Sequence, residues 1–123
     1  MTGTPAAVVG KRVLVAEDDY FIAKGLARSL KAAGAEVVGP VPTVAEALEA
    51  LRNTVVDAAV LDINLRGEPV FAVADVLMAC DVPFVFATGY SASAIPDRYA
   101  PVPRCEKPVE PQAFIRELFG SSA

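Results

Sequence analysis

The sequence predicts an α/β domain built on a five-stranded parallel sheet. Short apolar runs alternate along the chain with amphipathic segments of helical period, which is the pattern of strand–helix–strand units. The runs are rich in valine and alanine, as strands covered on both faces are. A chain of 123 residues suits one domain with a single core. We expect residues 11–119 to form it, with a flexible lead-in at 1–10 and a tail at 120–123.

The first strand and the first helix are expected between residues 12 and 34. The run at 12–16 is apolar over four consecutive positions and predicts a buried strand. Asp19 is placed to cap a helix in which apolar residues recur at every third or fourth position. Gly34 is expected to end that helix, because glycine readily adopts the backbone conformation found after many helices.

The second strand is expected at residues 36–38. Gly39-Pro40 should close it, because proline offers no N–H to a sheet. Thr43 and Glu46 have the spacing of a capping box, so a second helix should begin there.

The third strand is expected at residues 58–61, and an unusually apolar helix follows it. Pro69 fits the first turn of that helix. Its buried face should consist of Val70, Val73, Ala74 and Leu77. The segment 70–80 is apolar nearly all round, so Phe71 and Met78 could stay exposed and mark a contact surface for a partner or a second copy. Burial against neighbouring loops is the equal alternative, and the chain would then be a monomer rather than a weak dimer.

The last two strands are expected at residues 84–87 and 102–106. Prolines between them restrict the fourth helix to a short or irregular one near 92–97. The last helix should start near Pro111 and bury Phe114, Ile115 and Leu118.

Charge and hydropathy exclude two classes of partner. A net charge of −4 argues against a nucleic-acid surface. Lys24, Arg28 and Lys31 share one helical face, which we interpret as a solvated face. No apolar stretch approaches the ~18 residues that cross a membrane, and residues 1–10 lack the features of a signal peptide. We therefore expect a cytoplasmic protein.

Cysteine and histidine usage excludes zinc chemistry. Cys80 and Cys105 form no CxxC pair, and the chain has no histidine. Both thiols are expected to be buried and reduced. Because there is no histidine, any phosphohistidine donor would have to be another molecule.

Polar side chains follow four of the expected strands. Glu17 and Asp18 follow the first, Asp62 the third, Thr88 the fourth and Lys107 the fifth. In a parallel sheet these strand ends lie at one edge, where ligands bind. Glu17 and Asp18 can share one ion only if the chain curls past the strand end, because neighbours on a strand face opposite ways.

This set of residues suits phosphoryl chemistry with a divalent cation. Hard oxygen ligands without histidine or cysteine select Mg²⁺, Mn²⁺ or Ca²⁺. We expect Mg²⁺, with Mn²⁺ possible, because Mg²⁺ typically uses one or two carboxylates and bridges to phosphate. Asp62 is the candidate nucleophile, because a carboxylate can attack phosphorus and form an acyl phosphate. Lys107 and Thr88 could then contact the phosphoryl oxygens.

Four segments of the chain resemble the receiver domain of bacterial two-component response regulators. They are Val13-Leu14-Val15-Ala16-Glu17-Asp18, Leu61-Asp62-Ile63-Asn64, Ala87-Thr88-Gly89 and Glu106-Lys107-Pro108. The resemblance implies a doubly wound, flavodoxin-like fold with strand order 2-1-3-4-5. It also implies phosphorylation of Asp62 by a histidine kinase or a histidine phosphotransfer protein, so that the chain is a phosphoacceptor rather than an enzyme.

The resemblance also implies roles for the remaining site residues. Glu17, Asp18, Asp62 and the backbone carbonyl of Asn64 would bind Mg²⁺. Thr88 would be the switch hydroxyl and Lys107 the lysine that contacts phosphate. The Lys107-Pro108 peptide bond is often cis in this family.

One stretch resembles a particular subfamily of receivers. Phe86-Ala87-Thr88-Gly89-Tyr90 resembles the Phe-Ala-Thr-Gly-Tyr receivers of alphaproteobacterial stress and cell-cycle signalling. Arg104 stands where an aromatic switch residue is usual, so Tyr90 is the candidate that moves with Thr88. A single-domain regulator would signal by contact with a downstream protein or act as a phosphate sink.

Two other functions are considered. An aspartyl phosphatase of the haloacid dehalogenase type needs a second aspartate two positions after the nucleophile, where this chain has Asn64. A receiver that binds its partner without phosphorylation is the second alternative. A dinucleotide site is disfavoured, because no glycine-rich fingerprint follows the first strand.

Overall fold

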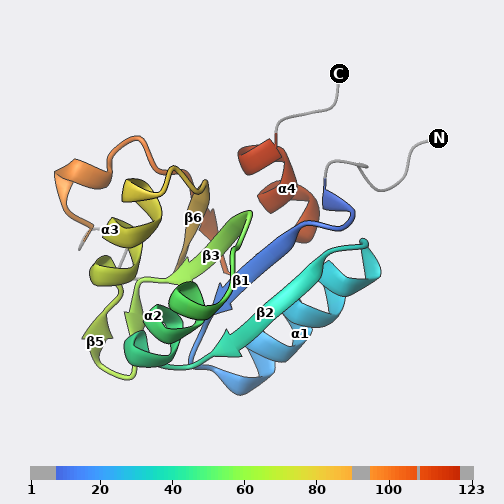
Figure 1. Ribbon diagram of the computed structural model, residues 1–123, viewed down its shortest axis with the longest axis horizontal. Coiled ribbons are helices and arrows are strands. Elements are labelled where there is room, and N and C mark those ends of the chain that lie inside the picture. Colours follow the sequence, from blue (N-terminus) through green and yellow to red (C-terminus); the bar gives the residue numbers. More distant parts are fainter. Residues whose placement is uncertain (1–7, 90–94, 108, 120–123) are drawn as a thin grey trace.

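A computed structural model describes residues 8–89, 95–107 and 109–119 of the chain (Figure 1). Its main sheet has the order β2-β1-β3-β6-β7 with every neighbouring pair parallel, as the sequence predicts. The five strands are β1 (Arg12–Ala16), β2 (Glu36–Val41), β3 (Ala58–Asp62), β6 (Phe84–Thr88) and β7 (Arg104–Glu106). The α-helices of the described ranges are α1 (Tyr20–Ala32), α2 (Val44–Asn53), α3 (Phe71–Ala79) and α4 (Pro111–Phe119).

Helices cover both faces of the sheet (Figure 1), and an apolar core lies under each helical layer. Leu14 and Leu61 point to one face and join a core with α2 and α3. Val13 and Val60 point to the other face and join a core with α1 and α4. Because side chains alternate along a strand, β1, β2, β3 and β6 contribute to both cores, whereas β7 contributes only Cys105, to the second core. The result is the doubly wound, flavodoxin-like fold.

The capping predictions for the first two helices are confirmed. The Asp19 carboxylate accepts hydrogen bonds from the N–H groups of Phe21 and Ile22, at 3.0 and 3.1 Å. The Thr43 hydroxyl accepts a hydrogen bond from the Glu46 N–H at 3.1 Å. These side chains satisfy N–H groups that have no partner inside the helix.

The predicted end of the second strand is wrong. β2 continues through Gly39-Pro40 to Val41, and its register against β1 shifts so that Leu14 faces Val38 while Ala16 faces Val41. Gly39 takes up this irregularity with a φ of +100°. Pro40 is tolerated because β2 is an edge strand, whose outer side needs no N–H partner.

The predicted start of the third helix is also wrong. Pro69 lies in β5 (Glu68–Pro69), which forms a small antiparallel hairpin with β4 (Asn64–Leu65), and α3 begins at Phe71. The two-residue turn between them, Arg66-Gly67, has positive φ at both positions, as tight hairpin turns require. The predicted buried face of α3 is confirmed at all four of its residues, Val70, Val73, Ala74 and Leu77.

The segment before β7 differs from expectation. Half of the predicted helix, residues 92–94, lies outside the described ranges. Residues 95 and 96 are not helical, and a 3₁₀ turn, η3 (Asp97–Tyr99), begins at the predicted last residue. β7 begins at Arg104 rather than at residue 102. The Tyr99 ring is fully buried and stacks on Phe71 with centroids 5.2 Å apart. The expectation that Phe71 stays exposed is therefore wrong, whereas Met78 is 43% exposed as expected.

Two further expectations are decided by burial and helix length. Cys105 is a buried free thiol, but Cys80, the residue that follows the last turn of α3, is exposed, contrary to prediction. No helix among the described residues is both long enough and apolar enough to cross a membrane.

Candidate functional site

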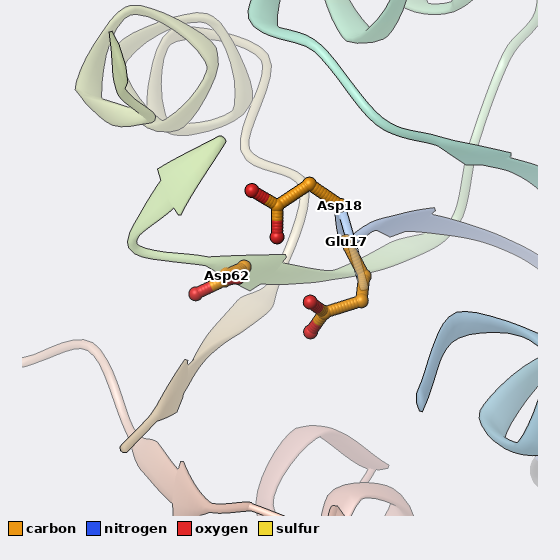
Figure 2. Close-up of side chains that lie close together, drawn as sticks. All are labelled: Glu17, Asp18 and Asp62. Carbon is orange, nitrogen blue, oxygen red and sulfur yellow. The ribbon is translucent and has the colours of Figure 1, made fainter. Parts of the chain in front are cut away.

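Three carboxylates meet at the edge of the sheet where the parallel strands end. Figure 2 shows Glu17 and Asp18 just after β1 and Asp62 at the end of β3, grouped around one space. One carboxylate oxygen of each residue lies within 4.8 Å of the others. Glu17 is buried and Asp18 and Asp62 are half-buried, so the group opens to solvent on one side.

The backbone after β1 turns so that two consecutive residues face this space. The Glu17 N–H donates to the carbonyl of Val41 at 3.0 Å, and the Glu17 carboxylate accepts from the Asp19 N–H at 3.0 Å. The Asp18 carboxylate accepts a hydrogen bond of 2.7 Å from the Arg66 N–H, in the turn of the β4–β5 hairpin. The curl past the strand end that the shared site requires is therefore present.

Lys107 joins the three carboxylates from the end of β7. Its Nζ lies 3.0 Å from Asp62 Oδ2 and 3.1 Å from Glu17 Oε1. Its backbone N–H donates to the carbonyl of Thr88 at 2.8 Å, which fixes the start of the side chain beside β6. The ammonium group neutralises part of a negative charge that would otherwise be unfavourable at this density.

Burial and neighbouring charges shift the pKa values of Glu17 and Lys107. Burial, together with the charge of Asp62, raises the pKa of Glu17 from 4.5 to about 7, against the lowering effect of the Asp19 N–H and of Lys107. Burial alone would lower the pKa of Lys107, but its contacts with Asp62 and Glu17 outweigh burial and raise it. The carboxylate of Glu17 therefore gains from any cation placed among these groups.

No described side-chain contact joins Thr88 or Asn64 to the three carboxylates. Thr88 is 4% exposed, and its hydroxyl lies 3.5 Å from the carbonyl of Cys105, a long distance for such a bond. Asn64 is exposed in β4, two positions beyond Asp62, and no described contact places its carbonyl among the carboxylates. Tyr90 and Pro108 lie outside the described residues. The expected geometry of the Lys107-Pro108 peptide bond therefore also lies outside them.

Sequence reasoning missed the backbone of Arg66 as a part of the site. Its N–H holds the Asp18 carboxylate across 48 positions of sequence. The available signal was the Arg66-Gly67 pair, which suits a tight turn, but the neighbouring residues Asn64 to Pro69 have no strong strand pattern.

The donor set fits a hard divalent cation. All three candidate ligands are carboxylates, one side is open for water, and neither histidine nor cysteine sulfur is near the three oxygens. Mg²⁺ typically uses one or two carboxylates and retains several waters, which this arrangement permits.

Comparison with solved structures gives the family. No family model matches the sequence, and no curated protein sequence matches it either. The solution structure of SdrG from Sphingomonas melonis Fr1 is 38% identical, with a TM-score of 0.78, and the match covers 92% of this chain and 96% of SdrG. A response regulator receiver protein from Sinorhizobium medicae WSM419 is 26% identical, with a TM-score of 0.74 over 89% of this chain and 92% of that protein.

The chain is a response regulator receiver domain. A longer protein contains a domain like it: the PhyR stress response regulator is 28% identical, with a TM-score of 0.71 over 91% of this receiver domain but only 44% of PhyR. The matching structures support a signalling role for this receiver. Its acidic group could bind a metal, as in other receiver domains.

Proposed function

We propose that this receiver is a single-domain response regulator phosphorylated on Asp62 by a histidine kinase or a histidine phosphotransfer protein. One observation carries the proposal: the Asp62 carboxylate lies 3.0 Å from Lys107 Nζ and within 4.8 Å of Glu17 and Asp18 oxygens. A nucleophilic carboxylate, an ammonium beside it and an all-oxygen cation site are the parts that phosphoryl transfer to an aspartate requires.

The transfer step needs no further reactant. A carboxylate oxygen of Asp62 forms the new bond to phosphorus, and the phosphorus–nitrogen bond of the partner's phosphohistidine breaks. The electron pair of that bond stays on the imidazole, which takes up a proton. Lys107 keeps contact with the phosphoryl oxygens as they arrive, since its ammonium already lies beside Asp62.

Glu17, Asp18, Asp62 and the carbonyl of Asn64 would hold Mg²⁺ or Mn²⁺. The bound cation would supply charge neutralisation at the phosphoryl oxygens. Glu17 releases its proton more readily when a cation takes that place, because its pKa is raised in the metal-free site.

Phosphorylation of Asp62 would change the conformation of the protein through Thr88, whose hydroxyl would turn toward the phosphoryl group. Within the described residues, its hydroxyl has one hydrogen-bond partner, the Cys105 carbonyl at a long 3.5 Å, so rotation toward a phosphoryl group costs little. Tyr90 would move with it, as in the Phe-Ala-Thr-Gly-Tyr receivers that the sequence resembles. Such a shift between two arrangements of the segment after β6 would present a new surface to a downstream protein.

The comparisons support this choice over other functions. A second SdrG structure, from Pseudomonas melonis Fr1, is described as the BeF3-activated conformation and is 39% identical over 85% of this chain. PhyR is described as a stress response regulator. We infer a cytoplasmic stress-signalling role in a phosphorelay, either through a protein target or as a phosphate sink.

The proposal is tested by phosphotransfer from a candidate histidine kinase in Mg²⁺. Wild type should take up label in a one-to-one ratio, Asp62→Asn should take up none, and a chelator should stop the reaction. Label that persists in Asp62→Asn would place the acceptor elsewhere. Sustained hydrolysis of a phosphomonoester would indicate a phosphatase, and partner binding unchanged by Asp62→Asn and by phosphorylation would indicate a receiver that works without phosphate.

A further inference from the structure

A cleft lies beside the acidic group, between α1 and the end of β2. This cleft of about 600 Å³ is enclosed by α1, by the end of β2 and by the turn of the β4–β5 hairpin. Ala23, Ala27, Pro40 and Pro42 give it apolar walls, and Tyr20 adds an aromatic ring. Its volume falls in the range of small-molecule sites.

Four cationic side chains line this cleft: Lys24, Arg28, Lys31 and Arg66. All four are exposed, and none forms an ion pair with another residue of the described ranges. Lys24 instead has its Nζ 5.5 Å from the centre of the Tyr20 ring. The chain as a whole is acidic, with a net charge of −4, so this is a local concentration of positive charge.

The charge pattern of α1 argues against an ordinary solvated face. α1 carries three basic residues and no acidic one, and all three basic residues line the cleft. α2 shows the ordinary arrangement, in which Glu49 and Arg52 pair across one turn at 3.2 Å. A helix that needed only solubility would mix the signs in the same way.

The spacing of the cations suits an extended anion. Lys24, Arg28 and Lys31 follow one another at four and three positions, so they rise about 10 Å along the helix axis. A chain of two or three phosphates can contact successive cations of such a row, while an attached ring lies against the prolines and Tyr20. Glu17 and Asp18 at one end of the cleft repel an anion and direct the phosphates toward Arg28 and Lys31.

We propose that this cleft binds a small organic polyphosphate, of which nucleoside di- and triphosphates are the simplest examples. The site differs from a dinucleotide fold, because side chains of α1 rather than a glycine-rich loop would contact the phosphates. Because the cleft shares Glu17 and Asp18 with the acidic group, its occupant would lie next to the phosphorylation site and could influence its accessibility.

The test is calorimetric titration with ADP, pyrophosphate and adenosine, in a buffer with chelator so that no divalent cation can hold the ligand. ADP should bind one-to-one, pyrophosphate more weakly and adenosine without measurable heat. The double substitution Arg28→Gln with Lys31→Gln should weaken ADP binding by about tenfold or more, since each removes a charged contact. Lys11→Gln with Arg116→Gln is the matched control, because it removes the same charge from exposed positions outside the cleft, and it should leave binding unchanged.

Three results would overturn the proposal. The first is that the wild type, shown to be folded by circular dichroism, binds neither ADP nor pyrophosphate. The second is binding that the Arg28/Lys31 double substitution leaves intact. The third is binding that appears only with Mg²⁺ and is lost in Glu17→Gln, which would place the nucleotide on the acidic group. An acidic peptide that binds where ADP does not would assign the cleft to a protein partner and also exclude the polyphosphate.

Discussion

Glu17 shows how one buried side chain connects stability with metal binding. It is 5% exposed, lies 3.1 Å from Lys107 Nζ and accepts a backbone hydrogen bond from Asp19. These contacts do not fully replace water, so its pKa rises to about 7. Its ionisation near neutral pH is therefore unfavourable until a cation enters the site.

The first prediction concerns Glu17→Gln in metal-free protein. The folded state holds the Glu17 proton more tightly than the unfolded chain, because the pKa of Glu17 is higher in the folded state. Protonation of Glu17 therefore stabilises the folded state fully below about pH 4.5, and this stabilisation is lost as the pH rises through about 7. At about pH 8, Glu17→Gln should exceed wild type in free energy of unfolding by on the order of 1–3 kcal/mol, and the difference should shrink toward about pH 5. Urea unfolding at both pH values measures it, and a difference independent of pH would contradict the account.

The second prediction concerns Mg²⁺ itself. Because the cation and the proton compete for Glu17, the Mg²⁺ dissociation constant should rise by up to about tenfold for each unit by which the pH drops below about 7, and it should be constant above that pH. Titration calorimetry over that range measures the effect. Glu17→Gln should bind Mg²⁺ more weakly and lose this pH dependence, and a wild type whose affinity does not change with pH would show that Glu17 is not a ligand.

At the scale of elements, a polar and aromatic network ties the segment before β7 to α3. The Tyr99 hydroxyl contacts the Asp75 carboxylate, the Phe71 carbonyl at 3.2 Å and the Arg98 guanidinium at 2.7 Å. This hydroxyl lowers the pKa of Asp75, and burial raises the pKa of Tyr99. The Tyr99 ring also packs edge-on against Phe86 of β6. These contacts anchor η3 to α3 and β6.

The third prediction follows from this network. Tyr99→Phe should lower the free energy of unfolding by about 1 kcal/mol, because the Phe71 carbonyl loses a partner while the ring stays packed. Tyr99→Ala should cost about 3–5 kcal/mol, because it leaves a cavity between α3 and β6. Tyr20→Phe is the matched control and should be neutral, since Tyr20 is exposed. Equal stability of Tyr99→Phe and wild type would show that the hydroxyl contacts contribute nothing.

The fourth prediction compares two glycines. A Cβ at Gly39 would lie 2.8 Å from the Val41 nitrogen and 3.0 Å from the Val15 carbonyl oxygen, and its φ is +100°. Gly39→Ala should therefore destabilise the protein by about 2 kcal/mol or more. Gly25 lies inside α1 with open space around it, so Gly25→Ala should stabilise by about 0.5–1 kcal/mol. Thermal melting checks both signs, and a neutral Gly39→Ala would refute the account of β2.

The elements that could be predicted from sequence are those with a strong local signal. β1 and the cap at Asp19 agree with the structure to the residue. The course of β2 could not be predicted, because it depends on Pro40 lying at an open edge, which is a property of the whole sheet. The β4–β5 hairpin was missed because its two-residue strands are too short to show any period.

At the scale of the whole molecule, strand order brings the site together. β1, β3, β6 and β7 are consecutive neighbours in the sheet and run parallel, so all four end at the same edge. Glu17 and Lys107 are 90 positions apart in sequence yet form an ion pair. The convergence of Glu17, Asp18, Asp62 and Lys107 could be predicted from strand ends alone. The orientation of the Thr88 hydroxyl toward Cys105 could not, because it depends on side-chain rotation.

The fifth prediction tests the central claim, that the Asp62 carboxylate accepts the phosphoryl group. Wild type and Asp62→Asn are incubated with a small acyl-phosphate donor and Mg²⁺, and their intact masses are measured. Wild type should gain the mass of one phosphoryl group, fragmentation should place it on Asp62, and Asp62→Asn should gain nothing. A phosphoryl group found on any other residue of the wild type, or a modified Asp62→Asn, would contradict the account.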